Sequence, residues 1–201
     1  MTARSLVLAS GSPARLRLLR DAGFDPAVAV SGIEESGVEA SDTATLVTVL
    51  AERKAAAVAD PSGDAVVVGC DSVLEFGGRP HGKPPSVEEA RRWLVSMRGR
   101  SGTLLTGHCV IDEPTGRRAS DVAATTVRFA ATTDAELDAY LATGEAMGVA
   151  GGFTLDGRSA PFIDGIEGDP GNVIGLSLPL LRSMLVKLSI AITDLWAPAG
   201  P

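Results

Sequence analysis

The chain has 201 residues, of which 45% are hydrophobic and 21% are charged, and its formal net charge at pH 7 is −7. This composition suits one globular domain, or at most two small lobes, and argues against disorder and fibre formation. No apolar run approaches the roughly 20 residues that cross a bilayer, and the first residues lack a signal-peptide pattern, so we expect a cytoplasmic protein without a membrane partner. The acidic balance argues against non-specific nucleic-acid binding but allows a small anionic ligand where a few cations converge.

Cysteine and lysine are both scarce. Cys70 and Cys109 form neither a CxxC pair nor a disulfide framework, which agrees with a reducing compartment and removes the simplest support for redox or structural zinc chemistry. Only three of the 18 basic residues are lysines, namely Lys54, Lys83 and Lys187. A lysine kept against this bias towards arginine can mark a place where a compact ammonium binds phosphate, although chance explains three residues equally well.

Strand-like and helical segments alternate along the chain. Short apolar runs with β-branched residues mark the strands, and amphipathic stretches that follow capping residues mark the helices. We expect strands over residues 5–9, 27–30, 65–70, 103–112 and 118–130. We expect helices over residues 13–22, 42–59, 87–97, 133–142 and 176–188.

The segments between these elements carry turn and loop signals. Ser12 is a candidate N-cap and Pro13 a candidate first residue of the first helix. Residues 113–116 resemble a hairpin loop, and we expect connecting loops over residues 77–85 and 144–171. We therefore predict one domain over residues 1–190, followed by a flexible C-terminal tail over residues 191–201.

This order of elements predicts the fold class. Helices that alternate with apolar strands, together with one hairpin, indicate a three-layer α/β domain with a twisted mixed β-sheet flanked by helices. Ligands of such sheets usually bind beyond the carboxyl ends of strands. The places to examine are therefore residues 10–15, after the first strand, and Asp71, after the strand at 65–70.

Residues 10–15 form the first candidate site. The sequence Ser10-Gly11-Ser12-Pro13-Ala14-Arg15 combines hydroxyls, flexible backbone, a helix N-terminus and an arginine, which together suit an anion. The same residue types also occur wherever a strand turns into a helix, so the motif has a purely structural alternative. The chain contains neither GxxxxGKS, GxxxxGKT nor GxGxxG, which excludes a P-loop and a dinucleotide fingerprint.

Two carboxylates and two lysines complete the candidate set: Glu35, Asp71, Lys54 and Lys83. A hard divalent cation such as Mg²⁺ takes one or two carboxylates together with phosphate oxygens and water. Each residue also has a plain alternative, because a loop acid can be merely solvated and a lysine can extend to the surface. Asp71 carries the strongest signal, since an unpaired buried carboxylate is costly.

Histidine and the remaining candidates carry weaker signals. His81 and His108 lack metal-ligand spacing and an obvious partner, so we interpret both as structural. Cys70 ends an apolar strand beside Asp71, whose charge would raise the pKa of the thiol. A buried apolar role for Cys70 is therefore favoured over a nucleophilic one.

Six blocks of the sequence together resemble the Maf family of nucleoside triphosphate pyrophosphatases, also called septum-formation-inhibitor-like proteins. The blocks run in the family's order from residue 6 to about residue 187, and residues 150–170 are most similar to actinobacterial members. The set is specific although no single block is decisive. The blocks are LASGSPAR at 8–15, IEE at 33–35, AERKA at 51–55, VGCDSV at 68–73, GKP at 82–84 and NVIGLSLP at 172–179.

The resemblance implies a fold, a reaction and roles for residues. It implies a Maf/inosine triphosphate pyrophosphatase-like fold with its active cleft between two lobes, a homodimer, and a house-cleaning role in nucleotide metabolism. The implied reaction is hydrolysis of a nucleoside triphosphate to the monophosphate and pyrophosphate with a divalent cation, Mg²⁺ or Mn²⁺. By motif position, Asp71 corresponds to the catalytic acidic residue, as base or as metal ligand, and Glu35 would help it to hold the metal. The residues implied to bind substrate are Ser10, Ser12, Arg15, Lys54 and Lys83.

Two positions depart from the family pattern. Members that favour dTTP and UTP tend to carry SPRR, whereas Ala14 stands at the first of those arginine positions, and they tend to carry Gln where this chain has Asp156. A carboxylate can accept hydrogen bonds from N1–H and N2–H₂ of guanine. We therefore expect Asp156 to bind the substrate's base, and we leave the base preference open, modified and non-canonical nucleotides included.

Two rival functions stay open. A non-catalytic nucleotide-binding regulator of cell division or septum formation would bind a triphosphate without turnover, and would have no need of Asp71 or a metal site. A non-nucleotide phosphatase would release orthophosphate, and the chain lacks a nucleophilic Asp or Cys motif for that reaction. The prediction that unites the candidate residues is a nucleoside triphosphate diphosphatase that uses metal-assisted attack by water.

Overall fold

The computed structural model describes residues 4–198, and it divides into two compact units. The first unit contains the chain up to Asp71, then Thr106–Ala123, and then the chain from Gly175 onward. The second unit contains Ser72–Leu105 and Ala124–Ile174. Within residues 4–198, no helix is both long enough and apolar enough to cross a membrane.

The strands form one mixed sheet in the order β2-β1-β3-β5-β6-β7, with β4 paired to β3. The pairs β1–β2 and β1–β3 are parallel, whereas β3–β4 and β6–β7 are antiparallel. This arrangement confirms the predicted mixed α/β sheet. The strands are β1 (Leu6–Leu8), β2 (Ala27–Val28), β3 (Val66–Phe76), β4 (Arg79–His81), β5 (Ser101–Asp112), β6 (Arg117–Phe129) and β7 (Ile163–Glu167).

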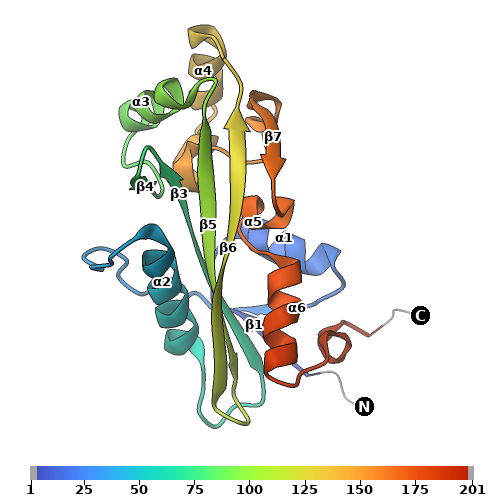
Figure 1. The fold of residues 1–201 in the computed structure, drawn as a ribbon. Helices are drawn as coiled ribbons and strands as arrows, with labels where there is room; N and C mark the ends of the chain where they lie inside the picture. Colours follow the sequence, from blue (N-terminus) through green and yellow to red (C-terminus); the bar gives the residue numbers. More distant parts are fainter. Residues whose placement is uncertain (1–3, 199–201) are drawn as a thin grey trace. The chain divides into compact units, whose positions relative to one another are not determined.

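The first unit has helices on both faces of its strands, and Figure 1 shows α2 and α6 on opposite sides of them. Apolar residues of α1 (Pro13–Asp21) and α6 (Leu178–Lys187) pack with Leu6, Leu8, Val66, Val68 and Val110 on one face. Alanines of α2 (Thr43–Val58) pack with Val67 and Cys109 on the other. Alternate strand residues point to opposite faces, so a run such as 66–68 contributes to both cores and is apolar throughout.

Two strand glycines allow α2 to approach the sheet closely. A Cβ at Gly107 would lie 2.1 Å from the carbonyl oxygen of Val47, and one at Gly69 would lie 2.4 Å from that of Ala51. Neither position has room for a side chain, because the obstacle is helix backbone. The close packing fixes the height of α2 above the strands, and α2 carries Lys54.

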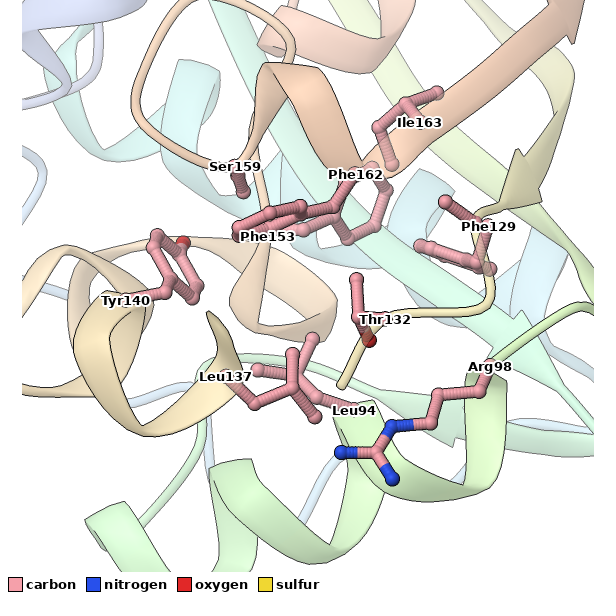
Figure 2. Close-up of a pocket in the computed structure, with 11 residues that line it drawn as sticks. Leu94, Arg98, Phe129, Thr132, Leu137, Tyr140, Phe153, Ser159, Phe162 and Ile163 are labelled. Atoms are coloured by element: carbon pink, nitrogen blue, oxygen red, sulfur yellow. The ribbon is translucent and has the colours of Figure 1, made fainter. Parts of the chain in front are cut away.

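The second unit packs α3 (Val87–Met97), α4 (Asp134–Leu141) and α5 (Pro170–Ile174), with short 3₁₀ turns at 145–148, 150–152 and 160–162, around its own apolar clusters. Figure 2 shows a pocket there between Leu94, Leu137, Phe129 and Phe153. Its volume of about 20 Å³ suits roughly one water molecule. This pocket is therefore far too small for a nucleotide.

Most predicted elements are confirmed with ends shifted by a few residues, but one strand boundary was wrong. The strand expected to stop at residue 70 continues through Asp71 to Phe76, where its last residues pair with β4 inside the expected 77–85 connector. Asp71 thus lies within a strand and not beyond its carboxyl end. A charge can sit inside the strand because Lys54 is paired with it.

Two other segments are more ordered than the expected loops and tail. The glycine-rich segment 144–171 contains β7, which pairs with β6, besides the three 3₁₀ turns. Residues 192–195, expected to start a flexible tail, form a 3₁₀ turn in which Leu195 is buried, and the backbone N–H of Ala197 donates to the carbonyl of Gly23. Transfer of the apolar Leu195 side chain from water into the core of the first unit stabilises this turn. Residues 199–201 of the expected tail lie outside the described residues.

Candidate functional site

The segment from Ser10 to Arg15 forms a cluster of polar donors at the start of α1. Ser12 is the N-cap, and its Oγ accepts from the backbone N–H of Arg15, while Pro13 is the first helical residue, as predicted. The Oγ of Ser10 accepts from the backbone N–H of Ser12 at 3.2 Å and from Nη1 of Arg15 at 3.0 Å. A helix N-terminus, two hydroxyls and a guanidinium at one place suit an anion such as phosphate.

Arg15 is held from a distant part of the sequence. Its Nε donates to the carbonyl oxygen of Gly175 at 2.7 Å, and the side chain is largely buried. Gly175 has φ +126°, and a Cβ there would lie 3.2 Å from Nε of Arg15. Only glycine combines that backbone angle with this close approach. The orientation of the guanidinium therefore depends on the backbone just before α6.

Lys54 brings two carboxylates together. Its Nζ lies 2.6 Å from Oδ1 of Asp71 and 2.7 Å from Oε1 of Glu35. Lys54 and Asp71 are buried, at 8% and 7% exposure, whereas Glu35 is on an exposed loop between β2 and α2. The residues come from a helix, a strand and a loop of the first unit. The structure thus brings Glu35 and Asp71 to the same ammonium, and their role as a metal-binding pair stays a prediction.

The surroundings of Asp71 act on its pKa in opposite directions. Burial raises the pKa of this carboxyl, while the ammonium of Lys54 and the more distant guanidinium of Arg15 lower it, and the net shift is upward. Arg15 is therefore close enough to act electrostatically on Asp71. The polar segment from Ser10 to Arg15 and the carboxylate of Asp71 thus belong to one electrostatic environment. A carboxylate with a raised pKa is a better proton acceptor than an ordinary aspartate.

The other two predicted site residues belong to the second unit. Lys83 is exposed on the loop after β4, and that loop is tied to residue 151 because the carbonyl of Gly82 accepts from the N–H of Gly151 at 2.9 Å. Asp156 is exposed between two 3₁₀ turns, and its Oδ1 accepts from the hydroxyl of Thr154. The roles of Lys83 and Asp156 stay predictions.

The carboxylates of the candidate site suit a metal that also takes water and substrate ligands, and do not suit a metal held by protein ligands alone. Within residues 4–198, no three His, Cys, Asp or Glu side chains gather as a metal cluster, so the described chain offers no all-protein metal cage. Glu35 and Asp71 instead offer hard oxygen donors that both contact the ammonium of Lys54. This set fits a cation such as Mg²⁺, which keeps water and substrate oxygens among its ligands.

The cysteines are not suited to nucleophilic chemistry. Burial raises the pKa of Cys70 to about 12, and it also raises the pKa of Cys109. The two thiols lie in cores on opposite faces of the strands. Both therefore stay protonated near neutral pH, in agreement with the predicted apolar role of Cys70.

Residues 5–188 match the family model described as Maf-like protein. The chain belongs to the Maf family. A curated relative from Streptomyces coelicolor, named nucleoside triphosphate pyrophosphatase, is 59% identical to this Maf chain over 98% of it and 96% of the relative. Relatives with the same name from Streptomyces avermitilis and Salinispora tropica are 56% and 53% identical, over 97% and 96% of this chain and 96% and 87% of their own.

Among solved structures, a HAM1 protein from Coxiella burnetii aligns with 92% of this Maf chain and 99% of its own, at 16% identity and a TM-score of 0.48.

Sequence reasoning missed the contact between Gly175 and Arg15. Gly175 holds Arg15 through its backbone carbonyl, and a carbonyl has no side-chain signature. The block NVIGLSLP at 172–179 was the available signal in this Maf sequence, because it contains Gly175 and belongs to the family pattern. Its role follows only from the folded positions of residues 15 and 175.

Proposed function

We propose that this Maf protein hydrolyses nucleoside triphosphates to the nucleoside monophosphate and pyrophosphate. The observation that carries the proposal is 59% identity, over nearly the whole of both chains, to a curated nucleoside triphosphate pyrophosphatase. The geometry of the first unit supports it. Lys54, which could bind phosphate, contacts the carboxylates of Glu35 and Asp71, and Arg15 is close enough to lower the pKa of Asp71. The enzyme is accordingly a hydrolase of nucleotide metabolism.

The proposed chemistry is attack of water on the α-phosphorus. The new P–O bond forms as the bond from the α-phosphorus to the α–β bridging oxygen breaks, and pyrophosphate leaves with that oxygen. Asp71 accepts the proton of the attacking water as general base. Positioning and charge stabilisation supply most of the catalysis in phosphoryl transfer.

Cationic groups hold the phosphate chain in this proposal. Arg15 and the hydroxyls of Ser10 and Ser12 bind phosphate oxygens at the start of α1. Lys54 carries three donors, of which two point to Glu35 and Asp71, and the third can take a phosphate oxygen. On the family pattern, Lys83 is proposed to supply a further ammonium for phosphate. A divalent cation held by Glu35 and Asp71, Mg²⁺ or Mn²⁺, would neutralise charge on the phosphate oxygens when bound.

The test compares products and variants. The parent, with Mg²⁺ or Mn²⁺, should release pyrophosphate and not orthophosphate from a panel of normal and modified nucleoside triphosphates. Asp71→Asn should reduce the rate at least ~100-fold, as expected for loss of a general base, while it still binds nucleotide. Asp21→Asn, which changes an exposed aspartate at the end of α1, should match the parent. Orthophosphate as the first product would contradict the proposal. Binding by the parent without turnover would favour the nucleotide-binding regulator of cell division.

We also propose that Asp156 contributes to base selection. Its exposed carboxylate can accept two N–H donors from a guanine edge, whereas glutamine can donate as well as accept. Asp156→Gln should change the ranking of triphosphates in the panel and leave the rate on a poor substrate within about threefold. An unchanged ranking, together with strong dTTP and UTP selectivity in the parent, would remove Asp156 from base recognition.

A homodimer in the cytoplasm is proposed on family membership alone. Sedimentation equilibrium of the purified chain should give twice the monomer mass of 20.6 kDa. A monomer at micromolar concentration would contradict the proposed dimer.

A further inference from the structure

A buried histidine lies in the first unit close to the backbone that holds Arg15. His108 on β5 is fully buried, with its Nδ1 2.9 Å from the carbonyl oxygen of Thr106 and its Nε2 2.9 Å from the backbone nitrogen of Ser177. A carbonyl only accepts and an amide N–H only donates, so Nδ1 carries the proton and Nε2 accepts. These two contacts select the neutral imidazole in one tautomer.

Ser177 closes a three-residue loop that connects His108 to Arg15. Ser177 is the N-cap of α6, Leu176 is fully buried, and the carbonyl of Gly175 accepts from Nε of Arg15 at 2.7 Å. Nη1 of Arg15 then donates to Oγ of Ser10 at 3.0 Å. Hydrogen bonds and three residues of backbone therefore run without interruption from His108 to the polar cluster at the start of α1.

The hydrogen bond from Ser177 to His108 has no substitute within helix α6. The backbone N–H of an N-cap residue lies outside the helical ladder, and a buried N–H without an acceptor costs free energy. Without His108, this N–H would have to move towards another acceptor and would displace the backbone of Gly175. Gly175 is in tight contact with Arg15, since a Cβ there would lie only 3.2 Å from Nε. A shift of Gly175 would therefore reach the guanidinium directly.

We propose that His108 is a positioning residue for Arg15. It holds the Gly175–Ser177 loop, and so keeps the carbonyl of Gly175 where it orients the guanidinium towards phosphate. The proposal rests on the proposed function, in which Arg15 binds a substrate phosphate.

The first test separates positioning from stability. His108→Leu removes the acceptor for Ser177, and it should raise KM for the triphosphate roughly tenfold while kcat stays within about twofold. His108→Gln should recover most of the lost affinity, because its amide oxygen can take the place of Nε2. Val110→Ala on the same strand removes contacts in the same core and should lower Tm without changing KM.

The second test is a double-mutant cycle with Arg15. Equilibrium binding of inorganic pyrophosphate with Mg²⁺ is measured for the parent, His108→Leu, Arg15→Ala and the double variant, because pyrophosphate is not consumed. His108→Leu should weaken binding roughly tenfold in the parent and less than about twofold in the Arg15→Ala background. Non-additivity of this kind would not result from general loss of stability.

The outcomes distinguish this proposal from the proposed function. If the parent releases pyrophosphate but His108→Leu leaves KM unchanged, or acts equally with and without Arg15, the positioning role is overturned and the enzyme activity stands. If the parent binds pyrophosphate but does not hydrolyse triphosphates, and the cycle is still non-additive, the positioning role stands and the proposed reaction fails. A parent that neither binds nor hydrolyses overturns both.

Discussion

Lys54 contacts both carboxylates of the candidate site in the first unit. Its ammonium lies within 2.7 Å of oxygens from both Glu35 and Asp71, and it is buried together with Asp71. A cation at this position offsets the repulsion that two carboxylates would otherwise feel. In the proposed enzyme the same oxygens would also hold a divalent cation, so the ammonium and the metal compete for shared ligands.

This competition predicts the effect of removing the ammonium. Lys54→Met should bind Mn²⁺ more tightly than the parent in the absence of nucleotide, by roughly tenfold or more, because a nearby positive charge disfavours a second one. Titration of Mn²⁺ followed by electron paramagnetic resonance measures the affinity. Lys187→Met removes an ammonium from an exposed pair with Asp121 and should leave the affinity unchanged. Equal or weaker Mn²⁺ binding by Lys54→Met would argue against Glu35 and Asp71 as metal ligands.

The elements of the first unit are set in place by contacts that side-chain periodicity does not reveal. Helix α2 carries Lys54 and approaches the sheet over Gly69 and Gly107, where its backbone occupies the space that a Cβ would need. Helix α1 carries Arg15, whose side chain reaches the backbone next to α6. The positions of Lys54 and Arg15 therefore depend on how helices pack on strands.

A substitution at Gly107 should show this dependence. Gly107→Ala places a methyl group against the backbone of Val47 and should lower the free energy of unfolding by about 3 kcal/mol or more, as overpacking of a core does. It should also reduce kcat, because α2 must shift with Lys54. Gly148→Ala faces open space and is the matched control for stability in urea unfolding. A stable, fully active Gly107→Ala protein would contradict the close packing of α2.

In the second unit, the end of α4 predicts an alkaline transition. Tyr140 is the only tyrosine in the chain, its hydroxyl donates to the carbonyl of Gly152 at 3.0 Å, and burial raises its pKa to about 12. Because the folded state holds this proton more tightly than the unfolded state, its contribution is complete below pH ~10 and is lost as the pH rises towards about 12.

Absorbance titration of the phenol should give a midpoint near 12 in the folded protein and ~10 in urea. Tyr140→Phe should lose about 1 kcal/mol of stability at pH 8 and less at pH 12. A folded midpoint near ~10 would mean that the hydroxyl is solvated.

At the scale of the whole molecule, the chain returns to the first unit for its last described residues. The backbone N–H of Arg4 donates to the carbonyl of Asp194 at 2.9 Å, Phe24 and Trp196 form an antiparallel bridge, and Leu195 is 3% exposed. Residues near both ends of the described chain thus take part in one core. The C-terminal segment contributes to stability although its Ala/Pro/Gly composition is typical of a loose tail.

Truncation tests this contribution. A chain that ends at Ala191 should lose about 2–3 kcal/mol, mostly from exposure of the Leu195 pocket, as measured by urea unfolding. A chain that ends at Ala197 keeps Leu195 and Trp196 and should be as stable as the parent. Equal stability of all three chains would show that residues 192–197 pack too weakly to matter.

From the amino-acid sequence alone, the mixed α/β class, the start of α1 at Ser12 and Pro13, and the residue types of the candidate site could be predicted. These features are local, because capping, periodicity and turn chemistry act within a few positions. The folded chain was needed to show that Asp71 lies inside a strand and that one ammonium contacts both Glu35 and Asp71. It was also needed to show that the carbonyl of Gly175 accepts from Arg15 and that His108 accepts from the backbone of Ser177. Those contacts join residues far apart in the chain, often through backbone atoms, and backbone atoms are the same in every residue.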